Sequence, residues 1–354
     1  MSRLLYVTNN NQGRSIGGRE QLSRLHSAAL LELFGDRFER LELIESGGLS
    51  RVFGYINGVS HASIEYVCTQ IKRFGAEKVF LDGSNLGRLA EGIAKRCSDV
   101  EISTFFHNCE ARFFLGALRQ HPSLRAAGVL MANYIAERNA VRFSDKLICL
   151  SERDSRQLRR LYGRSGTHIL PMAMQDQLPK DLPEMLPPKP GKYALFVGGT
   201  FYANRQGIEW FVDHVAPRAP IKTYVVGKGF EQWKGKLERK GNVEVVGSVD
   251  SLLPWYLGAQ VVIAPIFDGS GMKTKVAEAL MFGKRVIGTP EAFSGYEDIA
   301  ARVGTCCESP DEFVAALVTE AQRAHAGVNR SLREIYEQHY SFKAACQRLE
   351  EILS

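Results

Sequence analysis

Short apolar runs alternate along this chain with longer segments in which apolar residues recur every three or four positions. In the first half the apolar runs lie at 4–8, 41–44, 78–82, 101–106, 146–150 and 168–171. Helical spacing is clearest at 20–34 and 64–74. This alternation predicts a doubly wound α/β domain with a parallel sheet, whose ligands bind beyond the carboxyl ends of the strands.

The second half repeats the pattern with glycine at the strand ends. Apolar runs lie at 194–199, 222–229, 243–249, 261–265 and 285–289, and the first three run directly into glycine. Amphipathic helices are predicted at 311–323 and 342–353. Glycine turns gathered at one sheet edge allow several backbone segments to approach one ligand.

A proline-rich stretch separates the two halves. Six of the 13 prolines fall between residues 171 and 190, and no apolar period runs through them. A chain of 354 residues suits two cores better than one. We therefore expect a first domain at 1–172, a linker at 173–191 stiffened by proline, and a second domain at 192–341, with the helix at 342–353 able to pack back on the first domain.

Composition and charge narrow the class of protein. With 45% hydrophobic and 24% charged residues, and no apolar run approaching the ~18 residues of a membrane span, a globular cytoplasmic protein is expected. The seven cysteines contain no CxxC pair, so neither a disulfide framework nor a zinc site is indicated. Residues 1–172 hold 24 Lys and Arg against 17 Asp and Glu. This excess indicates either an anionic partner, such as an acidic membrane surface, or a solvated basic face; no nucleic-acid motif accompanies it.

Polar residues at the ends of the first-half strands are candidate functional groups. Gly17 and Gly18 follow the first strand without the GxGxxG spacing of dinucleotide-binding proteins, so an NAD-dependent enzyme is a poor interpretation. Asp82 ends another strand, and His107 ends the next. A histidine there either orients a reacting group or is structural, and position alone leaves both open.

The segment 261–288 concentrates the chemistry of the second half. It reads as a strand, a glycine-broken loop at 267–271, a helix at about 272–282 and a second strand. Glycines at such a turn, followed by a helix N-terminus, favour an anion. Helical spacing places Gly271, Lys275 and Glu278 on one face. Lys275 would neutralise a diphosphate and Glu278 would bind a ribose diol, or the two form an exposed ion pair. A P-loop is excluded because Met272 stands where that motif needs glycine.

The first glycine turn of the second half is followed by further candidates. Thr200, Asn204 and Arg205 come directly after it. Arg205 either clamps a phosphate through its planar, permanent cation or is simply exposed.

These segments resemble the retaining GT-B glycosyltransferases of family 4, also called group 1, in the branch with a Gly-Ser-Gly loop. Residues 196–211 (FVGGTFYANRQGIEWF) are similar to the first strand, loop and helix of that family's donor domain, and residues 243–297 to its nucleotide-sugar signature. Weaker similarity to the end of the acceptor domain lies at 144–158 and 168–172. The resemblance implies two Rossmann-like, doubly wound domains facing a cleft, and transfer of a sugar from a nucleoside diphosphate to an acceptor with retention at the anomeric carbon.

The resemblance also implies residue roles. Glu278 would hold the donor ribose, Arg205 and Lys275 the diphosphate, and His107 would lie near the transferred sugar. Gly17 and Gly18 would approach the diphosphate from the first domain. The remaining implied contacts of the nucleotide sugar are Gly199, Thr200, Asn204, Gly227, Lys228, Gly229, Val249, Asp268, Gly269, Ser270, Gly271, Met272, Lys273 and Thr274.

The chain departs from the family pattern at two positions. Many members carry a glutamate where Ser270 stands and a lysine where Gln206 stands. No Asp-x-Asp pair occurs, so we expect transfer without a metal ion or other cofactor. The implied acceptor is a glycan or lipid-linked glycan of a surface polysaccharide, reached at the inner face of a membrane. A nucleotide-sugar epimerase and a non-catalytic, transferase-like partner protein are the alternatives.

Overall fold

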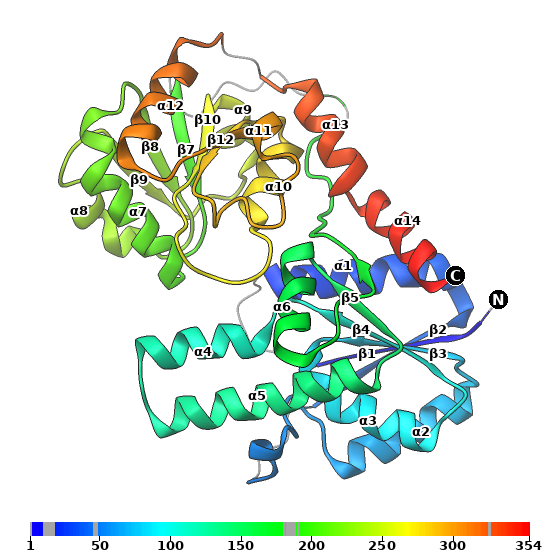
Figure 1. The fold of residues 1–354 in the computed structure, drawn as a ribbon. Coiled ribbons are helices and arrows are strands. Elements are labelled where there is room, and N and C mark those ends of the chain that lie inside the picture. The colour runs from blue at the N-terminus through cyan, green and yellow to red at the C-terminus, as the bar shows by residue number, and fades with distance from the viewer. Residues whose placement is uncertain are drawn as a thin grey trace. The chain divides into compact units, whose positions relative to one another are not determined.

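The computed structural model describes residues 2–9, 18–44, 49–179, 181, 189, 191–324 and 327–354. The chain divides into two compact units (Figure 1). Unit 1 comprises Met1–Pro171 and Ala345–Ser354, and unit 2 comprises Met172–Ala344. Gly17 and residues 180, 182–188 and 190 of the proline-rich linker lie outside the described residues.

Unit 1 is built on a parallel six-stranded sheet in the order β2-β1-β3-β4-β5-β6. The strands are β1 (Leu4–Asn9), β2 (Phe38–Leu43), β3 (Lys78–Asp82), β4 (Glu101–Phe106), β5 (Lys146–Cys149) and β6 (His168–Ile169). The helices are α1 (Gly18–Phe34), α2 (His61–Phe74), α3 (Gly87–Arg96), α4 (Glu110–Gln120), α5 (Leu124–Phe143) and α6 (Glu152–Tyr162), with the end of α14 (Phe342–Leu353). The core lies between the sheet and these helices, where Leu5, Val7, Val79 and Leu81 have no exposed surface.

The end of α14 is held in unit 1 by two lysines of the sheet. Lys78 Nζ donates to the carbonyl of Leu353, and Lys146 Nζ donates to that of Ile352 at 2.7 Å. Since the last carbonyls of a helix lack internal partners, these ammonium groups satisfy them and complement the negative end of its dipole.

Unit 2 repeats this architecture with the strand order β12-β11-β10-β7-β8-β9, again parallel throughout. Its strands are β7 (Tyr193–Val197), β8 (Lys222–Val226), β9 (Val243–Gly247), β10 (Val261–Ala264), β11 (Val286–Gly288) and β12 (Gly304–Cys306). Its helices are α7 (Tyr202–His214), α8 (Lys234–Leu237), α9 (Leu253–Gly258), α10 (Thr274–Met281), α11 (Ala300–Val303), α12 (Pro310–Gln322) and α13 (Arg330–His339). The predicted doubly wound α/β class is thus confirmed for both halves.

Several element boundaries differ from prediction by a few residues, and for two of them the reason is identifiable. β2 begins at Phe38 rather than at residue 41. It is an edge strand whose first residues are only half-buried, so they show no continuous apolar run. α10 begins at Thr274 rather than 272, because the backbone of Lys273 is still extended and that of Gly271 is left-handed, with φ +63°. Gly271 therefore lies in the loop and not on a helix face with Lys275.

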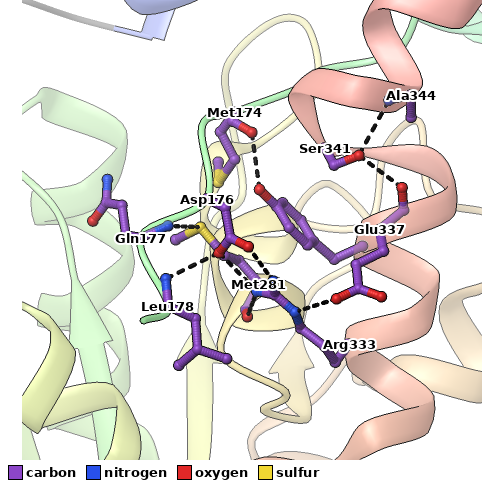
Figure 2. Close-up of polar contacts among 10 residues, drawn as sticks. Met174, Asp176, Gln177, Leu178, Met281, Arg333, Glu337, Ser341 and Ala344 are labelled. Carbon is purple, nitrogen blue, oxygen red and sulfur yellow. Dashed lines mark hydrogen bonds and ion pairs between the residues drawn. The ribbon is translucent and has the colours of Figure 1, made fainter. Parts of the chain in front are cut away.

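The segment that enters unit 2 is fastened to α13 and to the end of α10 (Figure 2). Arg333 donates to both carboxylate oxygens of Asp176, to Glu337 at 2.9 Å and to the carbonyl of Met281 at 2.6 Å. The hydroxyl of Tyr336 donates to a carbonyl of the same segment. The guanidinium thus joins three separate parts of unit 2 through charge-assisted hydrogen bonds.

Candidate functional site

Backbone hydrogen bonds at glycine residues join the ends of β7, β8 and β9. Gly198 N–H donates to the carbonyl of Val226 at 3.0 Å, and Gly227 N–H donates to that of Gly247 at 2.7 Å. A Cβ at Gly227 would lie 1.8 Å from the carbonyl oxygen of Gly198, and the φ of +148° there is one that other residues rarely adopt. The predicted crowding of glycine turns at one sheet edge is therefore observed.

A carboxylate that the sequence reading missed ties two of these turns together. Glu231, in the short 3-10 helix Phe230–Trp233, accepts from Gly229 N–H at 2.7 Å and from Ser248 N–H at 2.6 Å. Backbone N–H groups, its own first and then that of Ser248, lower the pKa of Glu231. Lys228 between these contacts is exposed and Val249 is half-buried. The carboxylate thus links the two turns. Because they lie far apart in the sequence, this link is visible only in the structure.

Lys275 is a buried cation at the same edge. It leaves α10, passes over the ring of Phe196 with Nζ 5.1 Å from the ring centroid, and is 8% exposed. A Cβ at Gly198 would lie 2.4 Å from Nζ. Asn204 is close by and donates to the Gly199 carbonyl at 2.8 Å. Among the described residues the ammonium group makes no hydrogen bond or ion pair, and burial lowers the pKa of Lys275 to about 8.

Glu278 lies one turn along the same helix. Its Oε2 accepts from the hydroxyl of Tyr256 at 2.7 Å, and that tyrosine stacks on Phe282 with the ring centroids 4.5 Å apart. Burial raises the pKa of Glu278. The interpretation of Lys275 and Glu278 as an exposed ion pair is wrong, because the lysine is buried and the carboxylate is bonded to tyrosine.

The loop before α10 is braced by its own side chains. Asp268 accepts from Gly269 N–H at 2.7 Å and from the hydroxyl of Tyr202 at 3.1 Å. Lys273 donates to Glu291 at 2.9 Å and to the carbonyls of Ser270 and Gly271. These contacts fix the loop and occupy the Lys273 ammonium, in contrast to that of Lys275.

Lys273, the N-cap residue of α10, makes no capping hydrogen bond through its side chain, so the start of the helix lacks the usual cap. Met272 is buried just before it, against Gly295, where a Cβ would lie 2.4 Å from Met272 Cγ. Thr274 is the first residue of the helix and is half-buried. The uncapped helix end and the Lys275 ammonium belong to the same short segment, a combination that suits an anion.

Arg205 flanks the end of β7 from the other side. Its guanidinium stacks on Trp233, 4.8 Å from the ring centroid, and its buried Nε makes no hydrogen bond with any residue that the structure describes. β7 lies between β10 and β8 in the sheet; Lys275 follows β10 and Trp233 follows β8. Arg205 is half-buried, so the simply exposed alternative is not what the structure shows. Thr200, also half-buried, packs against Gly229.

A separate polar cluster occupies the strand ends of unit 1. His107 Nε2 lies 2.9 Å from Asp82 Oδ1, and Thr8 donates to the other carboxylate oxygen at 2.9 Å. Burial lowers the pKa of His107, against the opposing effect of Asp82. Because a carboxylate only accepts, the neutral ring carries its proton on Nε2, which leaves Nδ1 as an acceptor. Nδ1 is buried without a partner among the described residues.

Two carboxylates adjoin this cluster. Glu110 is buried and lies 3.5 Å from Arg19, and burial raises its pKa to about 7. Glu137 accepts from the N–H groups of Glu110 and Ala111 at 2.9 and 3.1 Å and so caps the start of α4. Gly18, predicted to approach a diphosphate, is the first residue of α1 in this unit.

Comparison with known proteins identifies the class. Residues 191–322 match the family model described as "Glycosyl transferases group 1". A search of curated proteins finds no match. Among solved structures, sucrose-phosphate synthase from Thermosynechococcus elongatus shares 14% identity at a TM-score of 0.74, covering 100% of this chain and 98% of that one. HepE from Anabaena in complex with UDP shares 13% identity at a TM-score of 0.69, with 99% of each chain covered. A glycosyltransferase from Rickettsia africae shares 14% identity at a TM-score of 0.68, covering 100% of this chain and 99% of that one.

The chain therefore has the GT-B fold, and the match of residues 191–322 identifies a glycosyltransferase. Its unit 2 carries a group 1 domain, the kind that transfers a sugar from a nucleotide sugar.

Proposed function

We propose that the protein transfers a sugar from a nucleoside diphosphate sugar to a glycan or lipid-linked acceptor of a surface polysaccharide, with retention at the anomeric carbon. The observation that carries the proposal is Lys275. A buried ammonium group that makes no hydrogen bond or ion pair with any described residue is costly, and folded proteins normally pair such groups. Its position beside the uncapped start of α10 and the Gly198 turn suits a diphosphate, whose binding would supply the counter-charge.

In this proposal each side chain acts on a different part of the donor. Lys275 and Arg205 bind the diphosphate from the two sides of β7, and the backbone at Ser270 and Gly271 binds phosphate or sugar. Glu278, with one oxygen on Tyr256, accepts from the ribose diol with the other. The turns at 227–230 and 248–250 frame the base.

The same groups explain how transfer would be accelerated. Departure of the nucleoside diphosphate builds negative charge, and fixed cations with a helix N-terminus stabilise that charge without reorganisation. Among the described residues no group of three or more His, Cys, Asp and Glu side chains is arranged to hold a metal ion. We propose transfer without a metal, the phosphate charge being met by Lys275 and Arg205. His107 would accept a hydrogen bond through Nδ1 from a hydroxyl of the transferred sugar, and Gly17 and Gly18 would approach the diphosphate from unit 1.

The experiment that tests this proposal is a thermal-shift panel of UDP, GDP, ADP and CMP with their common sugar conjugates, in EDTA and in magnesium. A ligand that binds only the native state raises the free energy of unfolding by about 2.7 kcal/mol at a hundredfold excess over Kd. We expect a shift from one nucleoside diphosphate that persists in EDTA and is lost in Lys275→Ala. A shift from no nucleotide, or one that requires magnesium, would contradict the proposed site.

A further inference from the structure

The α4–α5 hairpin of unit 1 has an unusual charge pattern. Between Glu110 and Glu137 the chain contains no acidic residue, while it contains Arg112, Arg119 and Arg125. Most of the other residues are apolar, in the runs FFLGAL and LRAAGVLMA. A solvated helix pair normally mixes both signs of charge on its surface, so this hairpin is not of the ordinary solvated type.

The outer part of the hairpin contributes nothing to the core of unit 1. From Arg112 to Met131 no described side chain is buried, and the buried positions of α5 begin only at Ala132. Figure 1 shows α4 and α5 lying side by side and joined by a short turn. Leu124, the first residue of α5, is 95% exposed and Met131 is 51% exposed. Apolar residues gathered on an exposed surface mark an interaction site.

We propose that the outer part of this hairpin, residues 112–131, docks on an anionic lipid bilayer. Arginines on a segment that contains no acidic residue are complementary to anionic headgroups, and exposed leucine and methionine can enter the boundary between headgroups and acyl chains. No helix among the described residues is long and apolar enough to cross a bilayer, so the hairpin lies on the surface of the membrane. A protein partner would carry basic residues as well as acidic ones, and its basic residues would need acidic residues on the hairpin.

The hairpin is joined directly to the polar cluster of unit 1. α4 begins at Glu110, three residues after His107, and Glu137 of α5 caps that start. A hairpin resting on lipid would therefore hold the strand ends of unit 1 near the membrane, where a lipid-linked acceptor presents its sugar. Docking itself does not depend on the proposed transferase site.

The test is co-sedimentation with two kinds of vesicle. One is made of phosphatidylcholine alone, and in the other roughly 30% of the lipid is anionic phosphatidylglycerol. We expect binding to the anionic vesicles only, weakened by salt, because the charge term is screened. Changing Arg112, Arg119 and Arg125 to glutamine should weaken it on the order of a hundredfold, since each basic residue near an acidic surface contributes about fivefold.

The apolar contribution is tested by Leu124→Glu with Leu31→Glu as the matched control. Leu31 is a 54% exposed leucine on α1, so the same substitution there leaves the hairpin unchanged. We expect Leu124→Glu to abolish vesicle binding with an unchanged melting curve and unchanged nucleotide binding, and Leu31→Glu to bind as the wild type. Equal binding to neutral vesicles, or no loss in Leu124→Glu, would overturn the proposal. So would a dimer in lipid-free solution that Leu124→Glu dissociates, because a second copy would then cover the hairpin.

Discussion

Replacing Lys275 by methionine should stabilise the ligand-free protein and weaken nucleoside diphosphate binding at the same time. Methionine keeps the unbranched stem over Phe196 and removes only the buried charge. The lysine pKa is lowered from 10.5 to about 8. At 1.36 kcal/mol per pKa unit, the charged group costs the folded state about 3 kcal/mol near pH 7. Lys275→Met should recover most of that free energy of unfolding.

The pH dependence of this gain follows from linkage. A lysine whose pKa is lowered on folding loses its proton in the folded state first, so wild-type stability rises with pH between about 8 and 10.5. The advantage of Lys275→Met should therefore be about 3 kcal/mol at pH 7 and about half that near pH 9.5. Urea denaturation at these two pH values, followed by tryptophan fluorescence, measures it.

Lys284 is the matched control. Burial also lowers its pKa to about 8, but it donates to the carbonyls of Leu257 and Ala259 at 2.9 Å each. Lys284→Met leaves these buried carbonyls without that donor and should destabilise the protein, with nucleotide affinity unchanged. For Lys275→Met, loss of a charge-assisted contact predicts a 10- to 100-fold rise in Kd, roughly. A Lys275→Met protein that is less stable than wild type at pH 7, or that binds nucleotide equally well, would refute the reasoning.

Three further predictions concern the same two clusters. Nucleoside diphosphate affinity measured by calorimetry should fall as pH rises above about 8, because only the protonated Lys275 attracts phosphate, and Lys275→Arg should abolish this fall. Glu278→Gln should weaken binding of UDP about tenfold but leave that of inorganic pyrophosphate unchanged, since pyrophosphate has no ribose; equal losses for both would contradict the role. Asp82→Asn removes the charge that raises the His107 pKa and selects its tautomer, so nitrogen NMR should show Nε2 no longer uniquely protonated. In that variant kcat should fall while donor affinity is retained.

Two central strands of unit 1 were predicted to the residue from local pattern. β3 and β4 run over the residues predicted, because both are flanked on each side by other strands and are apolar along their length. The edge strand β2 was misplaced by three residues, since half-buried positions carry a weaker signal. β12, of only three residues, was not predicted at all.

Part of the candidate site could also be predicted from local sequence pattern. Helical spacing alone placed Lys275 and Glu278 on one face, and their helix does present them so. That Lys275 makes no hydrogen bond or ion pair with a described residue, that Tyr256 holds Glu278 and that Trp233 stacks on Arg205 depend on contacts between segments distant in sequence. The position of Gly271 was misjudged because backbone angles within a glycine loop are not encoded in apolar periodicity.

The carboxylate of Glu231 has a consequence for engineering donor specificity. Its two hydrogen bonds join the turns after β8 and β9, although Gly229 and Ser248 lie 19 positions apart in the chain. Grafting only one of these turns from a related enzyme would leave a backbone amide or the carboxylate without its hydrogen-bond partner. In the proposed site, where these turns frame the base, an exchange of base specificity would have to transplant both turns and Glu231 together.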